Sequence, residues 1–282
     1  MADLAQPTFP PEVEEFIFSL AIREDLKLAG RLLLVARRVY EWLIPHIYEV
    51  VIFRPNQECV PHQNLSPELF VEIGKHVRHM LVQTGNNDLE GETTSCIARC
   101  PNLRSLALWL GYNFTYSPEF LNNLLSLKLK YLAFRIGTFN AGLAKQGRTL
   151  PSPLSSITHL ELLGEVVRVN PHQVKEYFPA LTHFAINSFG FLNMSGLKEV
   201  KEVLDTFGNQ LEVAILYALQ FGKADSQSPT VNVAFREEDP RLVMLLHGAS
   251  AVDTWHDGVK GGPGIWTVAE EAVQARRAEL GR

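Results

Sequence analysis

Two histidines, His159 and His183, occupy the same slot in two copies of a short hydrophobic pattern, so they are expected on neighbouring strands. Adjacent strands lie about 5 Å apart, which brings side chains at matched positions together. Paired imidazoles can hold a transition metal, but a metal site needs further ligands, and only Glu161 is obvious nearby. We therefore expect solvated surface histidines here rather than a metal site.

The cysteines and the glycine-rich segment give no stronger signal of chemistry. Cys96 and Cys100 are spaced for one helical face without a second pair, and Cys100 is expected to pack as a small buried hydrophobe. The run from Gly258 to Gly264 lacks the Lys-Ser or Lys-Thr of a phosphate-binding loop. No serine-nucleophile elbow or metalloprotease helix motif is present. We predict no catalytic residue, cofactor or metal, and hence a protein that is not an enzyme.

The composition predicts a chain with a substantial core and without a surface for nucleic acid or membrane. Of the 282 residues, 46% are hydrophobic, and 26 basic against 31 acidic residues leave a formal net charge of −5. Nucleic acid and anionic membranes require a concentrated basic face, so neither is expected as a partner. No apolar stretch approaches the roughly 18 residues of a membrane span, and no secretory signal is recognisable. Three cysteines favour a reduced intracellular setting, cytoplasmic or nuclear.

A short apolar pattern, Φ-x-x-Φ-x-Φ with Φ an apolar residue, recurs through the middle of the chain. Its starts at residues 77, 103, 129, 157, 181 and 211 are separated by 26, 26, 28, 24 and 30 residues. Leucine-rich repeats have periods of roughly 20–29 residues. The copies are Val77, Met80, Val82; Leu103, Leu106, Leu108; Leu129, Leu132, Phe134; Ile157, Leu160, Leu162; Leu181, Phe184, Ile186; and a degenerate Leu211, Ala214, Leu216.

Helix signals lie between these copies. Ser66, Ser117 and Asn170 each place a capping side chain before a proline, and residues 195–208 carry apolar residues at helical spacing. Strand and helix alternating at a fixed period predict an α/β fold, a leucine-rich-repeat-like solenoid with a parallel sheet over residues 54–250. The alternative is an ordinary doubly wound α/β domain, which usually has a glycine-rich first turn that is not found here.

The repeated apolar pattern does not continue towards the C-terminus. Residues 138–156 and 221–229 are predicted loops, and residues 231–235 and 242–246 are predicted as two final strands. Residues 251–282 are predicted as a capping tail with a helix from about Thr267, where Thr267 and Glu270 form a capping box.

Residues 1–53 predict a small three-helix segment. Its first helix opens at Pro10-Pro11-Glu12, Pro45 is expected to end the third helix, and residues 47–53 predict a strand. The three apolar stripes are Val13, Phe16, Ile17, Leu20; Ala29, Leu32, Leu33, Ala36; and Val35, Val39, Trp42, Leu43.

This segment resembles an F-box. Residues 9–12 (FPPE) are similar to the Leu-Pro-x-Glu that opens an F-box, with Phe9 in place of leucine. Residues 34–42 (LVARRVYEW) resemble its Leu-Val-(Ser/Cys)-Arg-Arg-x-x-x-Trp stretch, with Ala36 in place of the small polar residue. Residues 100–108 (CPNLRSLAL) resemble the repeats that accompany F-boxes. The layout, including Ile44 to Tyr48, Asp239 to Arg241, Trp255, Gly261-Gly262 and Trp266, is similar to fungal, basidiomycete-type F-box-like proteins.

The resemblance implies a substrate-recognition subunit of a cullin-type ubiquitin ligase. The helices would bind the small adaptor protein of the ligase, and the repeats would hold a protein substrate. The implied adaptor contacts are Pro10, Pro11, Val13, Ile17, Leu34, Val35 and Trp42. The alternative for these residues is simple packing of the helices onto the first repeat. Two other functions stay open, a repeat scaffold without a role in ubiquitin transfer and an α/β enzyme with an active site scattered over loops.

Strand geometry selects a binding surface independently of any family. In Φ-x-x-Φ-x-Φ the apolar positions point inward, and positions three, five and seven point to the other face. Aromatic residues and arginine there are typical of the core of a protein interface. The predicted partner-binding face is made of His79, Trp109, Tyr131, Arg135, His159, Glu161, His183, Asn187 and Tyr217. The alternative is that the tail or loops cover this face.

Overall fold

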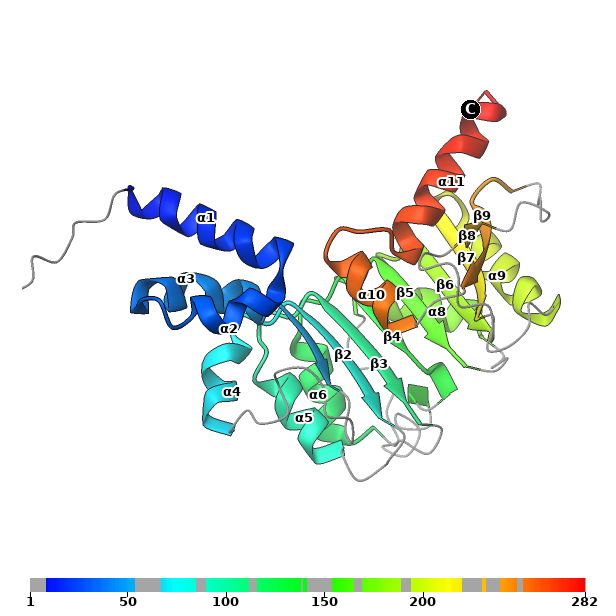
Figure 1. Cartoon of the computed structure of the whole chain (residues 1–282). Helices are drawn as coiled ribbons and strands as arrows, with labels where there is room; N and C mark the ends of the chain where they lie inside the picture. Colours follow the sequence, from blue (N-terminus) through cyan, green and yellow to red (C-terminus); the bar gives the residue numbers. More distant parts are fainter. Residues whose placement is uncertain are drawn as a thin grey trace, which may run out of the picture.

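The protein has an α/β fold built around one open sheet (Figure 1). The computed structural model describes residues 9–53, 67–84, 90–111, 116–137, 139–140, 154–164, 169–188, 194–219, 230–231, 239–247 and 251–281. Within these ranges the strands are β1 (Val50–Phe53), β2 (His79–Thr84), β3 (Ser105–Leu110), β4 (Tyr131–Phe134), β5 (His159–Leu163), β6 (His183–Ser188), β7 (Val213–Leu219), β8 (Thr230–Val231) and β9 (Leu242–His247).

The strands lie across the sheet almost in chain order, β1-β2-β3-β4-β5-β6-β7-β9-β8. Every neighbouring pair from β1 to β7, and the pair β7 and β9, is parallel. The short β8 pairs antiparallel with β9 at the edge. Parallel neighbours require a crossover between strands, and these crossovers contain the helices α4 (Pro67–Gly74), α5 (Glu90–Ala98), α6 (Pro118–Ser126), α8 (Pro171–Tyr177) and α9 (Met194–Phe207), the last followed by η3 (Gly208–Gln210).

The six copies of the apolar pattern lie in register on six neighbouring strands, as the sequence predicts. The third position of each copy pairs with the third position of the next, from His79 through Ser105, Tyr131, His159 and His183 to Val213. A shift by one residue would turn each apolar set to the opposite face, so the matched register keeps all six sets on one side.

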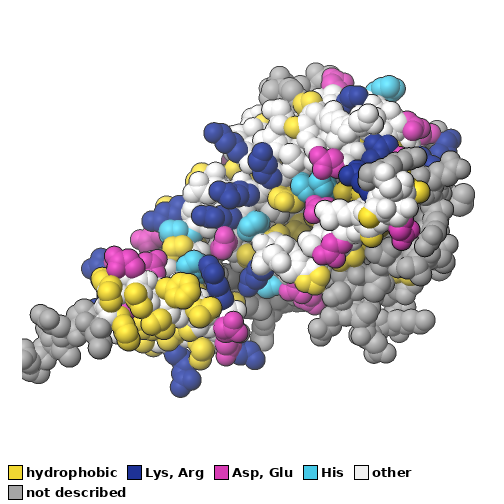
Figure 2. All heavy atoms as spheres, turned by 90° about the horizontal axis from the view of Figure 1, so that it is seen from above, with side chains coloured by type: hydrophobic (Ala, Val, Ile, Leu, Met, Phe, Trp, Pro, Cys, Tyr) yellow, Lys and Arg dark blue, Asp and Glu magenta, His cyan; other side chains and the backbone are white. Residues whose placement is uncertain are grey.

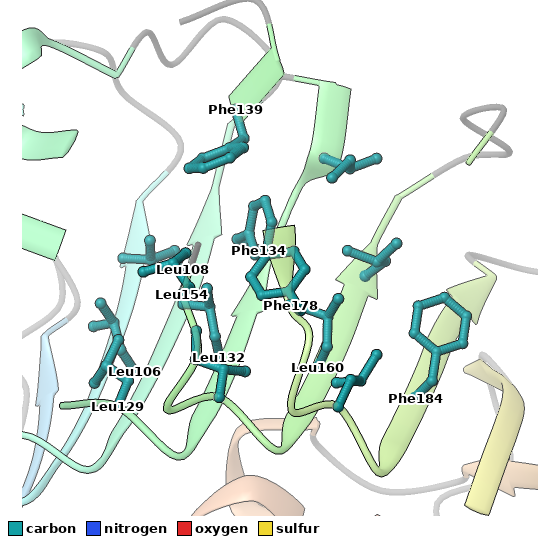
Figure 3. Packing of buried hydrophobic residues seen from close by; sticks show 14 of the residues in the cluster. Leu106, Leu108, Leu129, Leu132, Phe134, Phe139, Leu154, Leu160, Phe178 and Phe184 are labelled. Carbon is teal, nitrogen blue, oxygen red and sulfur yellow. The ribbon is translucent and has the colours of Figure 1, made fainter. Parts of the chain in front are cut away.

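That side of the sheet and the crossover helices enclose the main core. Positions four and six of every copy are buried there, and Figure 3 shows such pairs from neighbouring strands, Leu106 with Leu108 and Leu132 with Phe134. Phe178, which follows α8, packs beside Phe134 with their ring centroids 6.2 Å apart. Each fully buried side chain of this size contributes about 1.5–3 kcal/mol through removal of apolar surface from water.

Two of the predicted helix starts form as expected. The Ser117 hydroxyl accepts the Phe120 amide at 3.2 Å before α6, and the Asn170 side-chain oxygen Oδ1 accepts the amides of His172 and Gln173 before α8. Ser66 lies outside the described residues. Helix α5 was not predicted, because its sequence EGETTSCIA has only a weak apolar stripe. Cys100, just after it, is fully buried as predicted, and burial raises the pKa of its thiol to about 12.

The N-terminal segment contains α1 (Pro11–Glu24), η1 (Leu26–Leu28), α2 (Ala29–Leu32) and α3 (Arg37–Ile47). A small separate cluster of Ile22, Ala29, Val39 and Leu43 holds them together, and the Arg38 guanidinium contacts the Glu14 carboxylate at 2.9 Å. The prediction that Pro45 ends the third helix is wrong, since α3 continues to Ile47. The following strand is therefore shorter than predicted, and it joins the sheet beside β2.

The C-terminal tail contains two helices, α10 (Ala251–Val259) and α11 (Ile265–Glu279). Helix α11 begins before Thr267, with Gly264 as its N-cap, so the predicted capping box does not start it. The predicted loop at 221–229 and most of the one at 138–156 lie outside the described residues, as do Val233 and Phe235. None of the helices in the described ranges combines the length and apolar character that crossing a membrane requires.

Candidate functional site

The C-terminal helices lie on the sheet face opposite the crossover helices (Figure 1). On α11, Ala269 and Val273 pack in a buried cluster with residues of β6, β7 and β9. On α10, Val252 packs with Leu81, Ala107 and Ala133 from β2, β3 and β4. The tail is therefore a cover for the second face of the sheet.

This cover corrects the prediction of an open partner-binding face. Glu161, His183, Asn187 and Tyr217 are buried, so their predicted exposure is wrong. His79, Trp109, Arg135 and His159 are half-buried, and Tyr131 stays exposed at 37%. The physical reason is that position five carries mostly apolar residues, including Leu81, Ala107 and Ile215, whose exposure to water would be unfavourable.

A cavity of about 270 Å³ lies between this face and the tail helices. It brings together six predicted face residues and several tail residues that the sequence did not single out as a site. The strand side chains lining it include His79, Trp109, Tyr131, His159, Glu161 and Tyr217, and the tail side chains include Thr254, Trp255, Trp266 and Glu270.

A row of aromatic rings runs across β4, β5 and β6, and two of its members, Tyr131 and His159, line the cavity. The ring centroids of Tyr131 and His159 are 4.2 Å apart, and the rings of His159 and His183 stack at 4.0 Å with an interplanar angle of 12°. This row follows from the register, since the three residues are successive partners across parallel strands. Trp266 of α11 meets both histidine rings edge-on. The prediction of solvated surface histidines is therefore wrong.

Each histidine ring is held by the threonine that precedes it. Thr158 Oγ1 lies 2.9 Å from His159 Nδ1, and Thr182 Oγ1 lies 2.8 Å from His183 Nδ1. The same two hydroxyls lie 3.3 Å from the backbone carbonyls of Lys130 and Thr158, the residues just before β4 and β5. A hydroxyl has one proton, so in the tautomer in which it donates to the carbonyl it accepts from Nδ1–H of the ring.

Burial favours the uncharged form of both rings. Burial lowers the pKa of His159 to about 3, and the neighbouring His183 acts in the same direction. Burial also lowers the pKa of His183, although Glu270 and Glu212 oppose this shift. His183 Nε2 lies 3.1 Å from the Glu270 carboxylate, a partner that comes from α11.

Glu161 sits in a separate hydrogen-bonded group on the same face. The Tyr217 hydroxyl donates to the Glu161 carboxyl and accepts from Asn187 Nδ2 at 3.0 Å. Burial raises the pKa of Glu161 to about 7, while the Tyr217 hydrogen bond acts in the opposite direction. Glu161 was the one further metal ligand that the sequence suggested beside the histidines. Its carboxyl is instead hydrogen-bonded to Tyr217.

Tyr217→Phe is expected to lower the free energy of unfolding by about 1–3 kcal/mol, because it leaves the buried Glu161 carboxyl without its donor. Urea denaturation at neutral pH measures the change. Tyr40→Phe is the control, since Tyr40 is exposed, and its effect should stay within about 0.5 kcal/mol. Equal stability of the two variants would contradict the assigned hydrogen bond.

The predicted adaptor contacts lie elsewhere, on the N-terminal helices. Six of the seven are exposed: Pro10, Pro11, Val13, Ile17, Leu34 and Val35. Trp42 is half-buried and packs against the small helical cluster. The structure thus separates two groups of predicted residues, one on α1 to α3 and one at the cavity.

Sequence reasoning missed Glu270 and the two tail tryptophans as site residues. Trp255 and Trp266 were noted only as part of the resemblance, and Glu270 only as a capping residue. Two tryptophans in a short tail are a signal of packing against the rest of the fold, because so large an apolar side chain is rarely left in water. Their partner surface depends on contacts between residues far apart in the chain.

Comparison of the chain with models of protein families, with curated proteins and with solved structures finds no match in any of the three.

Proposed function

We propose that the chain is a protein-binding subunit. Its N-terminal helices dock onto the small adaptor protein of a cullin-type ubiquitin ligase. The observation that carries this proposal is a surface of exposed apolar side chains on α1 to α3. Figure 2 shows hydrophobic side chains gathering on this end of the molecule. We call this surface the N-terminal apolar patch. Its members are Phe9, Val13, Phe16, Ile17, Leu20, Leu34 and Val35.

The patch is not needed for packing within the helical segment. Helix α1 turns its other side, with Ser19 and Ile22, towards α3, so its apolar stripe faces solvent. Phe16 is 65% exposed, and Leu34, between α2 and α3, is 86% exposed. Packing onto the first repeat therefore does not account for these residues. Contiguous exposed apolar surface is typical of a protein-binding site.

Four patch residues coincide with adaptor contacts implied by the F-box resemblance. Val13 and Ile17 come from α1, and Leu34 and Val35 come from the turn before α3. The motif and the exposure are independent observations, since the first depends on residue types and the second on packing. Their agreement favours an adaptor-binding surface over an unrelated docking function.

The remaining chain is proposed to be a leucine-rich-repeat-like solenoid that holds the substrate protein. The support is the strand order from β1 to β7, in which each strand lies beside the next in the chain. A doubly wound domain instead reverses its strand order at a switch point. The matched register of six pattern copies and the crossover helices on one face also favour repeated stacking of one unit.

The double substitution Leu34→Asp with Val35→Asp tests the docking proposal. The purified chain is expected to bind the purified ligase adaptor in isothermal titration calorimetry. The variant should bind more than about 30-fold more weakly, which corresponds to a loss of about 2 kcal/mol for interface anchors. Both side chains are exposed, so the fold should persist, as circular dichroism can verify.

Val71→Asp is the matched control. Val71 is 60% exposed on α4, outside the N-terminal apolar patch, so this change should leave adaptor binding unaltered. Absence of binding by the unmodified chain would reject the ubiquitin-ligase role and favour the repeat scaffold without it. Equal binding by the double variant would reject the patch as the docking surface.

A further inference from the structure

Three metal-binding side chains converge beside the cavity, from parts of the chain that are distant in sequence. They are His159 on β5, His183 on β6 and Glu270 on α11, and one donor atom from each lies within 4.8 Å of the other two. None of them belongs to the N-terminal apolar patch, so this site is independent of the proposed docking function.

We propose that His159, His183 and Glu270 bind a divalent transition-metal ion of the Zn²⁺ type and that this ion fastens α11 to the sheet. Two imidazoles and one carboxylate form a donor set that suits zinc, whereas Mg²⁺ and Ca²⁺ prefer oxygen ligands alone. Tetrahedral zinc with bonds near 2.1 Å places its donors about 3.4 Å apart. The separation of His183 Nε2 from the Glu270 carboxylate, 3.1 Å, is already close to this value.

The Nδ1 side of each imidazole is held by a second group, and binding one ion requires the two stacked rings to turn towards it. Histidines that bind metals almost always donate their other ring N–H to a second group, which fixes the ring and its tautomer. Here the hydroxyls of Thr158 and Thr182 contact Nδ1 of His159 and His183, and both hydroxyls are themselves anchored on backbone carbonyls. In the tautomer with the proton on Nδ1, Nε2 of each ring carries the lone pair that would bind the ion, and for His183 this bond replaces the direct contact with the Glu270 carboxylate.

The charge of the site also suits a cation. Glu270 supplies negative charge, and its side chain is 44% exposed, so it can adjust to the coordination geometry without disturbing the core.

The ion would have an open side towards the cavity. His159 and Glu270 both line it, so three protein ligands leave a fourth position facing that space. The cavity wall also carries Thr254 Oγ1 and Trp109 Nε1, buried polar atoms without a hydrogen-bond partner among the described residues. Polar groups of this kind can bind a water or a small ligand that coordinates the metal.

Zn²⁺ titration of the full chain, after treatment with a chelator, tests the proposal. Isothermal titration calorimetry should show one Zn²⁺ per chain, and Co²⁺ at the same site should give d–d absorption bands. Thr182→Val keeps the side-chain shape but removes the hydroxyl from His183, and it should weaken binding by about 10- to 100-fold. His183→Gln and Glu270→Gln should weaken Zn²⁺ binding at least as much as Thr182→Val does.

His172→Gln is the matched control, since His172 is exposed on α8 and should not affect binding. Hydrogen exchange gives a second measurement, because Zn²⁺ should slow exchange of the α11 amides in the unmodified chain and not in Glu270→Gln. Glu270 is partly exposed, so that variant is expected to fold. Equal Zn²⁺ affinity of the unmodified chain, His183→Gln and Glu270→Gln, or no 1:1 complex, would overturn the site. Unchanged α11 exchange with Zn²⁺ bound would overturn the fastening role.

Discussion

Val273→Asp is expected to lower the free energy of unfolding by about 3–5 kcal/mol, the cost of leaving a charge uncompensated in an apolar interior. Val273 is 2% exposed and packs among residues of β7 and β9, including Val243 and Leu245. Because α11 packs on the outer face of the sheet, the strain is relieved most directly by detachment of that helix. Urea denaturation measures the loss of stability, and hydrogen exchange should show lost protection in α11.

Gln274→Asp is the control for this substitution. Gln274 is the next residue on α11 and is exposed, so the same new carboxylate should change stability by no more than about 0.5 kcal/mol. If Val273→Asp were as stable as the control, α11 would not pack on the sheet as described. The position of Glu270 beside His183 would then also be wrong.

Phe184→Ala should destabilise the fold by about 3–5 kcal/mol through the cavity that it leaves in the main core. Phe184 is 0% exposed on β6, between the sheet and the crossover helices (Figure 3). The loss should appear as a lower midpoint of a single urea transition, because the main core is one continuous cluster from β1 to β9. Two separate transitions would indicate that the sheet is divided into independent units.

Phe184→Leu is the graded comparison, since leucine retains much of the buried surface and leaves a smaller cavity. We expect Phe184→Leu to lower the free energy of unfolding by about 1–2 kcal/mol. A loss below about 1 kcal/mol for Phe184→Ala would contradict the placement of β6 in the shared core.

The sheet was predictable because its signals are local. Side chains alternate across a strand, so the spacing of Leu106 and Leu108, repeated in Leu132 and Phe134, already assigns both pairs to one face. The capping residues Ser117 and Asn170 likewise act within one helical turn and indicated where α6 and α8 begin. Helix α5 was missed because it has only a weak apolar stripe and depends on the core around it.

The second face of the sheet was predicted less well, for a physical reason. Position five bears Leu81, Ala107 and Ile215, which favoured a covered face, whereas Trp109 and Tyr131 suggested an interface. Both readings fit the same residues, because an interface core and a protein interior have similar composition. Only the docking of α10 and α11 distinguishes them, and it covers most of the face while leaving the cavity.

Residue types and spacing alone therefore determined the α/β class, the register of the repeated strands and the pairing of His159 with His183. The three-dimensional packing decided which face is covered, which apolar stripe of α1 faces water, and that Glu270 meets His183. Glu270 and His183 are 270 − 183 = 87 residues apart. No periodic pattern extends over such a separation, and the contact forms because burying the tail on an apolar sheet face removes both surfaces from water.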